Sequence, residues 1–158
     1  WLVQMSSRAL NKKGAVRADK MINAWLRQLA AAATGSNARG FLVARDAIIE
    51  MAPLDPGEAR GQLAALVALW RRNLDQPLPV ACKTSLAVLQ EGDPRSTYNG
   101  GFELSGEVED PCLARLWPDF AALSADPEWF AFAQALYGPL AQWVMQDISV
   151  TPLDKDEA

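Results

Sequence analysis

Three long segments of the chain carry apolar residues at the spacing of an α-helix. The first begins at Asp19, and Gly35 stands just past its last apolar position, where a left-handed cap ends many helices. The second follows Asp55-Pro56, a pair that opens helices because the carboxylate accepts free amide protons and proline has none to leave unpaired. The third begins at Asp126-Pro127, and Gly138-Pro139 should kink it. The apolar stripe of the second helix should fix that face against a core. The apolar positions are Ile22, Trp25, Leu26, Leu29, Ala30 and Ala33 in the first, Leu63, Leu66, Val67, Trp70 and Leu74 in the second, and Trp129, Phe130, Phe132, Ala133, Leu136, Leu140, Trp143 and Val144 in the third.

Shorter patterns predict strands in the N-terminal part of the chain. Residues 41–44 and 47–51 are rich in β-branched and aromatic side chains, which favours two short strands. Residues 1–5 form another β-like run, and the turn signal at 11–14 predicts a hairpin within residues 1–18.

The C-terminal half is predicted to hold a long loop and a frayed end. Residues 93–111 are the longest polar, glycine-containing stretch, and long loops in compact domains usually carry function, so we expect a contact surface there. A short helix should start at Lys83, and another should follow over residues 112–117. We expect one domain over residues 1–150 and a flexible tail over 151–158.

Composition narrows the class of protein. The 158 residues are half apolar and 22% charged, which indicates a globular chain, and they contain neither a bilayer-spanning run nor a signal peptide. The lack of histidine excludes His-dependent catalytic triads and removes the commonest zinc ligand. Cys82 and Cys112 show no paired spacing, so we expect buried, reduced thiols in a cytoplasmic protein. Because the sequence starts at Trp1, we expect a domain excised from a longer chain.

Charge is distributed unevenly along the chain. Residues 1–45 have a net charge of +7, whereas residues 73–158 have a net charge of −10. A basic segment suits a polyanion such as nucleic acid, although an ordinary solvated surface is the alternative. The candidate DNA-binding residues are Arg8, Lys12, Lys13, Arg17 and Lys20.

The six tryptophans give a second, weaker argument for nucleic-acid binding. Their rings could stack on bases. However, Trp25, Trp70, Trp129 and Trp143 all lie on predicted apolar helix faces, so core packing is the favoured interpretation.

The sequence offers no candidate catalytic or metal-binding residues. Carboxylates could hold Mg²⁺ for phosphodiester hydrolysis, and nucleases of the PD-(D/E)xK type place an acid two residues before a lysine, so that both side chains share one face of a strand. None of the five lysines has an acid at that position. Lys83-Thr84 resembles the end of a phosphate-binding loop, but no glycine lies between Pro77 and Gln90 to let the backbone approach a phosphate.

Three segments carry a resemblance to a known family. They are RADKMINAWLRQLA at 17–30, LDPGEARGQLAALVALWRRNLDQPLPVACKTSLAVL at 54–89, and YNGGFELSGEVEDPCLARLWPDFAAL at 98–123. With these segments the chain resembles the C-terminal domain of RecC, the gamma subunit of exodeoxyribonuclease V, over most of residues 15–145. Its most specific pieces are PLPVACKTS and the glycine-rich stretch from Tyr98 to Glu107.

The resemblance implies a fold, partners and a role. RecC-like proteins assemble with RecB-like and RecD-like subunits to process double-strand DNA ends in recombinational repair. They are not membrane proteins. Their C-terminal domain is an α/β (α+β) fold, with helices packed on a small mixed sheet, similar to PD-(D/E)xK nucleases without their active-site residues. It helps to split the duplex and to hold the partners. The resemblance therefore implies no cofactor in this chain, since ATP and Mg²⁺ belong to the partner subunits. The expected partner-binding residues are Tyr98, Asn99, Gly100, Gly101, Gly106 and Glu107.

Three hypotheses follow from the sequence. The first is a noncatalytic domain that processes DNA and contacts other subunits of a RecBCD-type helicase-nuclease. The second is a direct, nonspecific DNA-binding module that works through the basic N-terminal third. The third is an enzyme whose missing acids are supplied by a partner.

Overall fold

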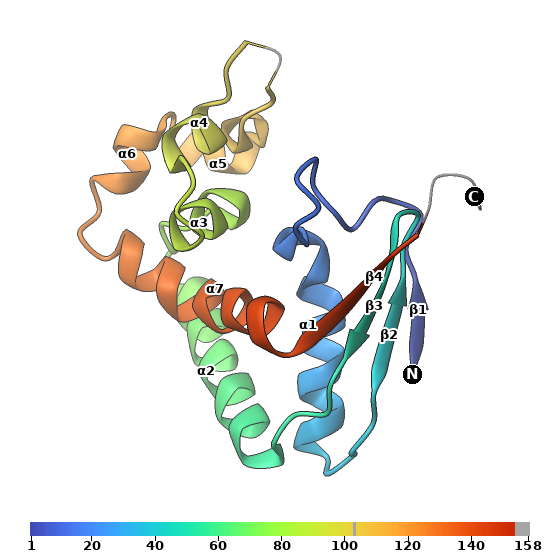
Figure 1. Ribbon diagram of the computed structural model, residues 1–158. Coiled ribbons are helices and arrows are strands. Elements are labelled where there is room, and N and C mark those ends of the chain that lie inside the picture. Colours follow the sequence, from blue (N-terminus) through green and yellow to red (C-terminus); the bar gives the residue numbers. More distant parts are fainter. Residues whose placement is uncertain (103, 154–158) are drawn as a thin grey trace. The chain divides into compact units, whose positions relative to one another are not determined.

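The computed structural model describes residues 1–102 and 104–153, which combine helices with a four-stranded mixed sheet (Figure 1). This confirms the predicted α/β class. The chain divides into two compact units, which we describe separately. Unit 1 comprises residues 1–67 together with the chain from Gln142 onward, and unit 2 comprises residues 68–141. The single domain predicted over residues 1–150 stays a prediction.

The sheet lies in unit 1 and has the strand order β1-β2-β3-β4. Strand β1 (Leu2–Gln4) runs parallel to β2 (Gly40–Val43), and β3 (Ala47–Met51) and β4 (Ile148–Pro152) continue the sheet in antiparallel fashion. The two strands predicted on either side of residue 45 are confirmed.

The predicted first helix is also confirmed. Helix α1 (Ala18–Ala33) lies along the sheet in Figure 1. It ends as predicted: Gly35 has a φ of +86°, its amide donates to Ala32 O at 2.8 Å, and the Ser36 amide donates to Ala31 O at 3.1 Å. These two bonds form a Schellman motif, which satisfies carbonyl groups that the helix leaves unpaired.

Alternation along the strands gives the sheet its buried face. In β2 and β3 every second residue is buried, because successive side chains of a strand point to opposite faces. The buried side chains of α1 recur at helical spacing, so a helical stripe and a sheet face form the core of unit 1. The core side chains on these three elements are Met21, Ala24, Trp25, Leu29, Ala32, Leu42, Ala47, Ile49 and Met51.

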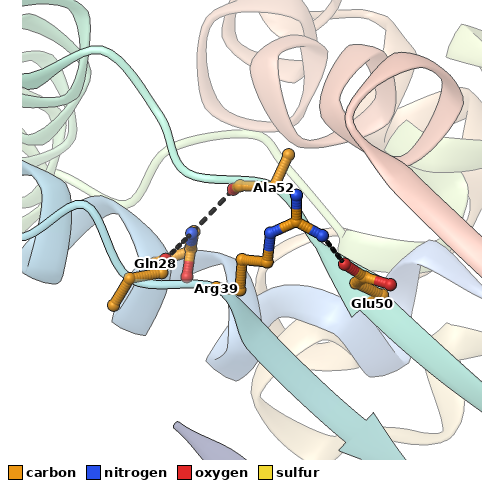
Figure 2. Close-up of polar contacts among 5 residues, drawn as sticks. Gln28, Arg39, Glu50 and Ala52 are labelled. Carbon is orange, nitrogen blue, oxygen red and sulfur yellow. Dashed lines mark hydrogen bonds and ion pairs between the residues drawn. The ribbon is translucent and has the colours of Figure 1, made fainter.

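One polar side chain lies in this core, the amide of Gln28 (Figure 2). Gln28 is 1% exposed, and its Nε2 donates to Ala38 O at 2.9 Å and to Ala52 O at 2.7 Å. Its Oε1 accepts the indole proton of Trp1 at 2.9 Å. The Trp1 ring lies against Gly40, where a Cβ atom would be 2.5 Å from it. Gln28 therefore ties α1 to the chain beside β1, β2 and β3.

The hairpin predicted within residues 1–18 is only partly correct. β1 does not pair with a strand in residues 11–18; it pairs with β2, more than thirty residues later in the sequence. The two strands are parallel, so the chain must cross over between them, and α1 forms this crossover. The predicted turn is present, because Leu10 and Val16 form an antiparallel bridge. The Asn11 carboxamide closes it by accepting from the Lys13 and Ala15 amides at 2.8 and 3.0 Å.

The second helix begins as predicted but does not bury its apolar stripe. In α2 (Pro56–Asp75), Asp55 accepts the Glu58 amide at 2.8 Å, which confirms the N-cap. However, Ala59 is the buried residue of this helix, whereas Val67, Trp70 and Leu74 are exposed. The prediction that this stripe packs in a core is therefore wrong for Val67, Trp70 and Leu74, whereas Leu63 and Leu66 are half-buried.

Unit 2 is built from short helices, several of which begin at an aspartate. They are α3 (Cys82–Leu89), α4 (Pro94–Asn99), the 3₁₀ turn η1 (Glu107–Glu109), α5 (Pro111–Leu116) and α6 (Phe120–Ser124), followed by α7 (Trp129–Gln146), which ends in unit 1. The uninterrupted loop predicted over 93–111 is wrong, because Asp93 caps α4 by accepting the Arg95 and Ser96 amides. Pro139 lies within α7 as expected, and a kink there stays a prediction.

The C-terminal prediction needs one correction. The predicted tail starts too early, because Thr151 and Pro152 lie in β4 and pair with Ile48 and Ala47 of β3. The Leu153 amide extends this pairing by donating to Asp46 O at 2.9 Å. The rest of the predicted tail, residues 154–158, lies outside the described residues. Across residues 1–102 and 104–153, no helix has the length and apolar content needed to cross a bilayer.

The Gln28 contacts generate a stability prediction. Gln28→Met keeps the size of the side chain but leaves Trp1 Nε1 and two backbone carbonyls without their partner, so we expect a loss of about 1 to 3 kcal/mol in the free energy of unfolding. Urea unfolding followed by circular dichroism measures it. The matched control is Gln142→Met, because the exposed Gln142 amide bonds to Gln146 alone and its loss should cost less than about 0.5 kcal/mol. Equal stability of the two variants would contradict this role for Gln28.

Candidate functional site

The basic residues predicted to bind DNA lie on the segment after β1 and at the start of α1. Arg8, Lys12, Lys13 and Lys20 are exposed, and none of them forms an ion pair within residues 1–102 and 104–153. Arg17 differs, because its guanidinium pairs with Asp19 at 3.1 Å. Four of the five predicted cations are therefore exposed and have no ion-pair partner among the described residues.

Hydrogen bonds to its backbone amides and carbonyls hold this segment in place. The Asp46 carboxylate, in the turn between β2 and β3, accepts the Ala9 amide at 2.7 Å and the Leu10 amide at 3.2 Å. The Arg17 amide donates to Ala9 O at 2.8 Å, which fixes the start of α1 against the same segment. The β2–β3 turn, the segment after β1 and the N-terminus of α1 therefore meet at one end of unit 1. We call this region the basic end, defined by Arg8, Lys12, Lys13, Arg17, Lys20 and Arg45.

Arg45 belongs to the basic end but not to the predicted set. It is exposed, and it lines an open depression of about 440 Å³. The depression lies where the parallel strands β1 and β2 end. A signal in the sequence could have found Arg45, since it directly follows a predicted strand, but only the parallel pairing of β1 and β2 brings it beside the segment after β1. The residues that line the depression are Gln4, Met5, Ser6, Val43, Ala44 and Arg45.

The residues predicted to bind partners lie in unit 2, where several make internal contacts. Tyr98 is fully buried in a small apolar cluster with Ala81 and Leu123, and its hydroxyl donates to Trp117 O at 2.6 Å. Burial, and then the nearby Glu107 carboxylate, raise the pKa of Tyr98, so this hydroxyl stays protonated as a donor. Asn99 accepts the Phe120 amide at 2.8 Å.

The predicted glycines shape the turn between α4 and η1. Gly100 has a φ of +73°, and a Cβ atom there would lie 2.7 Å from Gly106 N. A side chain at Gly106 would meet the backbone of Tyr98 and Gly100 in return. Gly101, by contrast, is exposed and has open space around it. A partner-binding role for this turn stays a prediction, and the structure assigns Gly100 and Gly106 a conformational role.

Glu107 links this turn to α3. Its carboxylate accepts the Lys83 amide at 2.9 Å and the Thr84 amide at 2.6 Å. Helix α3 has no capping side chain at its own N-cap residue, Ala81, so Glu107 satisfies its free amides from a distance along the sequence. The negative charge also interacts favourably with the positive end of the helix.

A second depression, of about 310 Å³, brings this carboxylate close to other acids. Glu107, Glu109 and Asp110 line it together with Lys83. Glu109 accepts the Gly106 amide at 3.2 Å and Asp110 accepts the Cys112 amide at 2.8 Å, so each of the three acids has a backbone partner. In the part of the chain that the structure describes, no three acidic or cysteine residues are arranged to hold a metal ion.

The two cysteines also lie in unit 2. Cys82 is half-buried at the start of α3, and Cys112 is exposed on α5, so the expectation that both thiols are buried is wrong for Cys112. Burial raises the pKa of Tyr137, and contact with Cys82 adds to the shift, so the Tyr137 hydroxyl remains protonated.

Comparisons with known proteins complete the picture of the chain. The family model described as "RecC C-terminal domain" matches residues 1–93. The match covers β1, α1, β2, β3, α2 and α3. It begins at residue 1, whereas most of the resemblance seen in the sequence begins at residue 15. The glycine-rich stretch of residues 98–107 lies beyond the match. No curated protein matches the chain significantly.

Proposed function

The chain belongs to the RecC C-terminal domain family, and on that premise we propose that it is a noncatalytic DNA-processing and subunit-interaction domain of a RecBCD-type helicase-nuclease. Membership makes the chain part of a RecBCD-type complex that acts in DNA repair and recombination. The proposed partners are RecB-like and RecD-like subunits and double-strand DNA ends. ATP and Mg²⁺ chemistry is assigned to the partner subunits.

The use of the acids beside Lys83 carries the noncatalytic part of the proposal. A metal-dependent nuclease needs carboxylate oxygens that converge on a metal ion, next to a cation that stabilises the developing charge. Glu107 instead binds two amides of α3, and Glu109 and Asp110 each bind an amide nearby. If these carboxylates bound a metal ion instead, the amides would lose their acceptors, including the two at the N-terminus of α3.

An exposed apolar stripe on α2 supports the subunit-interaction part. Val67, Trp70 and Leu74 are spaced by three and four residues, so they share one side of the helix, and they are 45%, 59% and 66% exposed. Large apolar side chains that lie together on a surface mark interaction sites more often than single ones do, and tryptophan is enriched among residues that dominate binding energy. We assign this stripe to a subunit contact.

A pull-down tests the subunit contact. The chain, immobilised, should retain RecB-like and RecD-like subunits, and the double variant Trp70→Ala/Leu74→Ala should lose at least one of them by about tenfold or more, because two buried anchors each contribute about 1 kcal/mol or more to such interfaces. Met145→Ala is the matched control, since Met145 is 75% exposed on another helix. Retention of both subunits by the double variant at the level of the control would reject the α2 stripe as the contact.

Direct DNA binding by the basic end is the second candidate function. It is favoured by four exposed cations that form no ion pair in the part of the chain that the structure describes, Arg8, Lys12, Lys13 and Lys20. They lie close in sequence on a segment that Asp46 fixes, so their charges act together on a polyanion. This function is compatible with the first one in a complex that threads DNA.

The salt dependence of binding tests this second function. If the four unpaired cations each neutralise one phosphate, the logarithm of the association constant for duplex DNA should fall with the logarithm of salt concentration at a slope of about −3.6. The double variant Lys12→Gln/Lys13→Gln should reduce the slope to about −1.8. Fluorescence anisotropy with a labelled duplex measures both slopes. A flat response of the wild-type chain would exclude phosphate contacts by this end.

A further inference from the structure

We propose that the depression at the carboxyl ends of β1 and β2 binds a phosphodiester of the DNA backbone, with Arg45 as its main ligand. This inference rests on the proposed DNA-binding function and adds to it a site and a residue. Arg45 lies outside the set of DNA-binding residues predicted from the sequence, which ends at Lys20.

The location of the depression favours a ligand. β1 and β2 are parallel neighbours in register, with Gln4 beside Val43, so both strands end at the same edge of the sheet (Figure 1). Loops that leave neighbouring strands at one edge of a sheet often carry binding residues, because the sheet holds them in fixed positions. The depression of about 440 Å³ lies at this edge.

The lining has the donors that a phosphate needs. Gln4, Ser6 and Arg45, which carry an amide, a hydroxyl and a guanidinium, are among its lining residues, and none of the described residues that line it is an acid. A guanidinium has five donors in a planar fork that matches two phosphate oxygens. Arg45 is exposed and forms no ion pair in the described residues, so its charge is available.

The nearest acid along the chain does not compete for Arg45. Asp46 uses both carboxylate oxygens on backbone amides, Oδ1 on Ala9 and Oδ2 on Leu10. The Arg45 amide donates to Ser7 O at 3.4 Å. Arg8 follows Ser7 in the chain, so the backbones of the two arginines lie near each other. Asp46 thus holds the backbone beside the site and leaves the Arg45 guanidinium to a ligand.

A polymeric phosphate fits this surface better than a small phosphate. The depression is open, and the exposed lysines at 12, 13 and 20 belong to the segment after β1 and the start of α1, which Asp46 and Ala9 tie to the β2–β3 turn. A strand that places one phosphate at Arg45 can place neighbouring phosphates along these lysines, so the contacts add up over several charges. A single inorganic phosphate would meet only the first of them.

Substitution of Arg45 in the full chain tests the proposal by fluorescence anisotropy with a labelled duplex. With Arg45 as a fifth contact, the wild-type slope should be about −4.5; Arg45→Gln should reduce it to about −3.6 and weaken binding by about fivefold to tenfold at about 0.1 M salt, as the loss of one phosphate contact predicts. Arg45→Lys keeps the charge and should keep the slope. The matched control is Arg27→Gln, which removes an exposed charge of α1 about 15 Å along the helix from Arg17 and should change affinity by less than about twofold.

Amide chemical shifts of the ¹⁵N-labelled chain supply a second measurement. Adding the same duplex should shift the amides of Ser6, Ala44 and Arg45 in the wild-type chain. If the duplex binds, Lys12→Gln/Lys13→Gln weakens it, and Arg45→Gln does not, then the depression is not the site while DNA binding by the basic end still holds. If Arg27→Gln weakens binding as much as Arg45→Gln, the effect is one of net charge and the site is rejected. If the wild-type chain does not bind at all, this inference and the DNA-binding function fall together.

Discussion

The buried amide of Gln28 is the contact on which unit 1 depends. It lies in an apolar core, where an amide without partners is costly, and all of its hydrogen-bonding groups reach a different part of the chain. The indole of Trp1, the carbonyl before β2 and the carbonyl after β3 must all be in place at once to satisfy it. This requirement sets the position of α1 along the sheet. In turn, α1 carries Arg17 and Lys20 at its start and so sets one side of the basic end.

Carboxylates acting on backbone amides are the recurring device of the rest of the chain. Asp46 does this for the basic end, Asp55 for α2, Asp93 for α4, and Glu107 for α3. Unit 2 has many helices for its length, and several of them begin at an acidic residue. This explains part of the negative charge of the C-terminal half. Carboxylates bound in this way are not available as metal ligands, because moving the oxygen to a metal ion would leave an amide at the helix N-terminus without an acceptor, at a cost in free energy. This links the fold of unit 2 to the noncatalytic role that we propose.

The sequence predicts the elements whose signals are local. The helical spacing before Gly35 and the Asp55-Pro56 start are examples, and both are confirmed. The start of α4 was missed although Asp93-Pro94 has the same signature, because the glycines after it suggested a loop. β4 was missed for another reason: its five residues become a strand only by pairing with β3, about a hundred residues earlier.

The site was predictable to the same extent. The basic residues are adjacent in sequence and could be found by counting charges, whereas Arg45 joins them only through the parallel pairing of β1 and β2. Burial was the least predictable property. Tyr98 stands in a polar, glycine-rich stretch and is fully buried, while Trp70 stands in an apolar stripe and is 59% exposed. Local hydrophobicity alone does not determine which apolar side chains the fold buries. For the exposed stripe on α2, we propose that a partner subunit buries it.

The noncatalytic role that we propose requires that the acids of unit 2 bind helix amides and not metal ions. Incubation of the purified chain with end-labelled linear duplex DNA over a range of Mg²⁺ concentrations tests it most directly. The account predicts that the DNA stays intact at every Mg²⁺ concentration. Mg²⁺-dependent cleavage that is abolished by Glu107→Gln or Asp110→Asn, in variants that remain folded by circular dichroism, would contradict it.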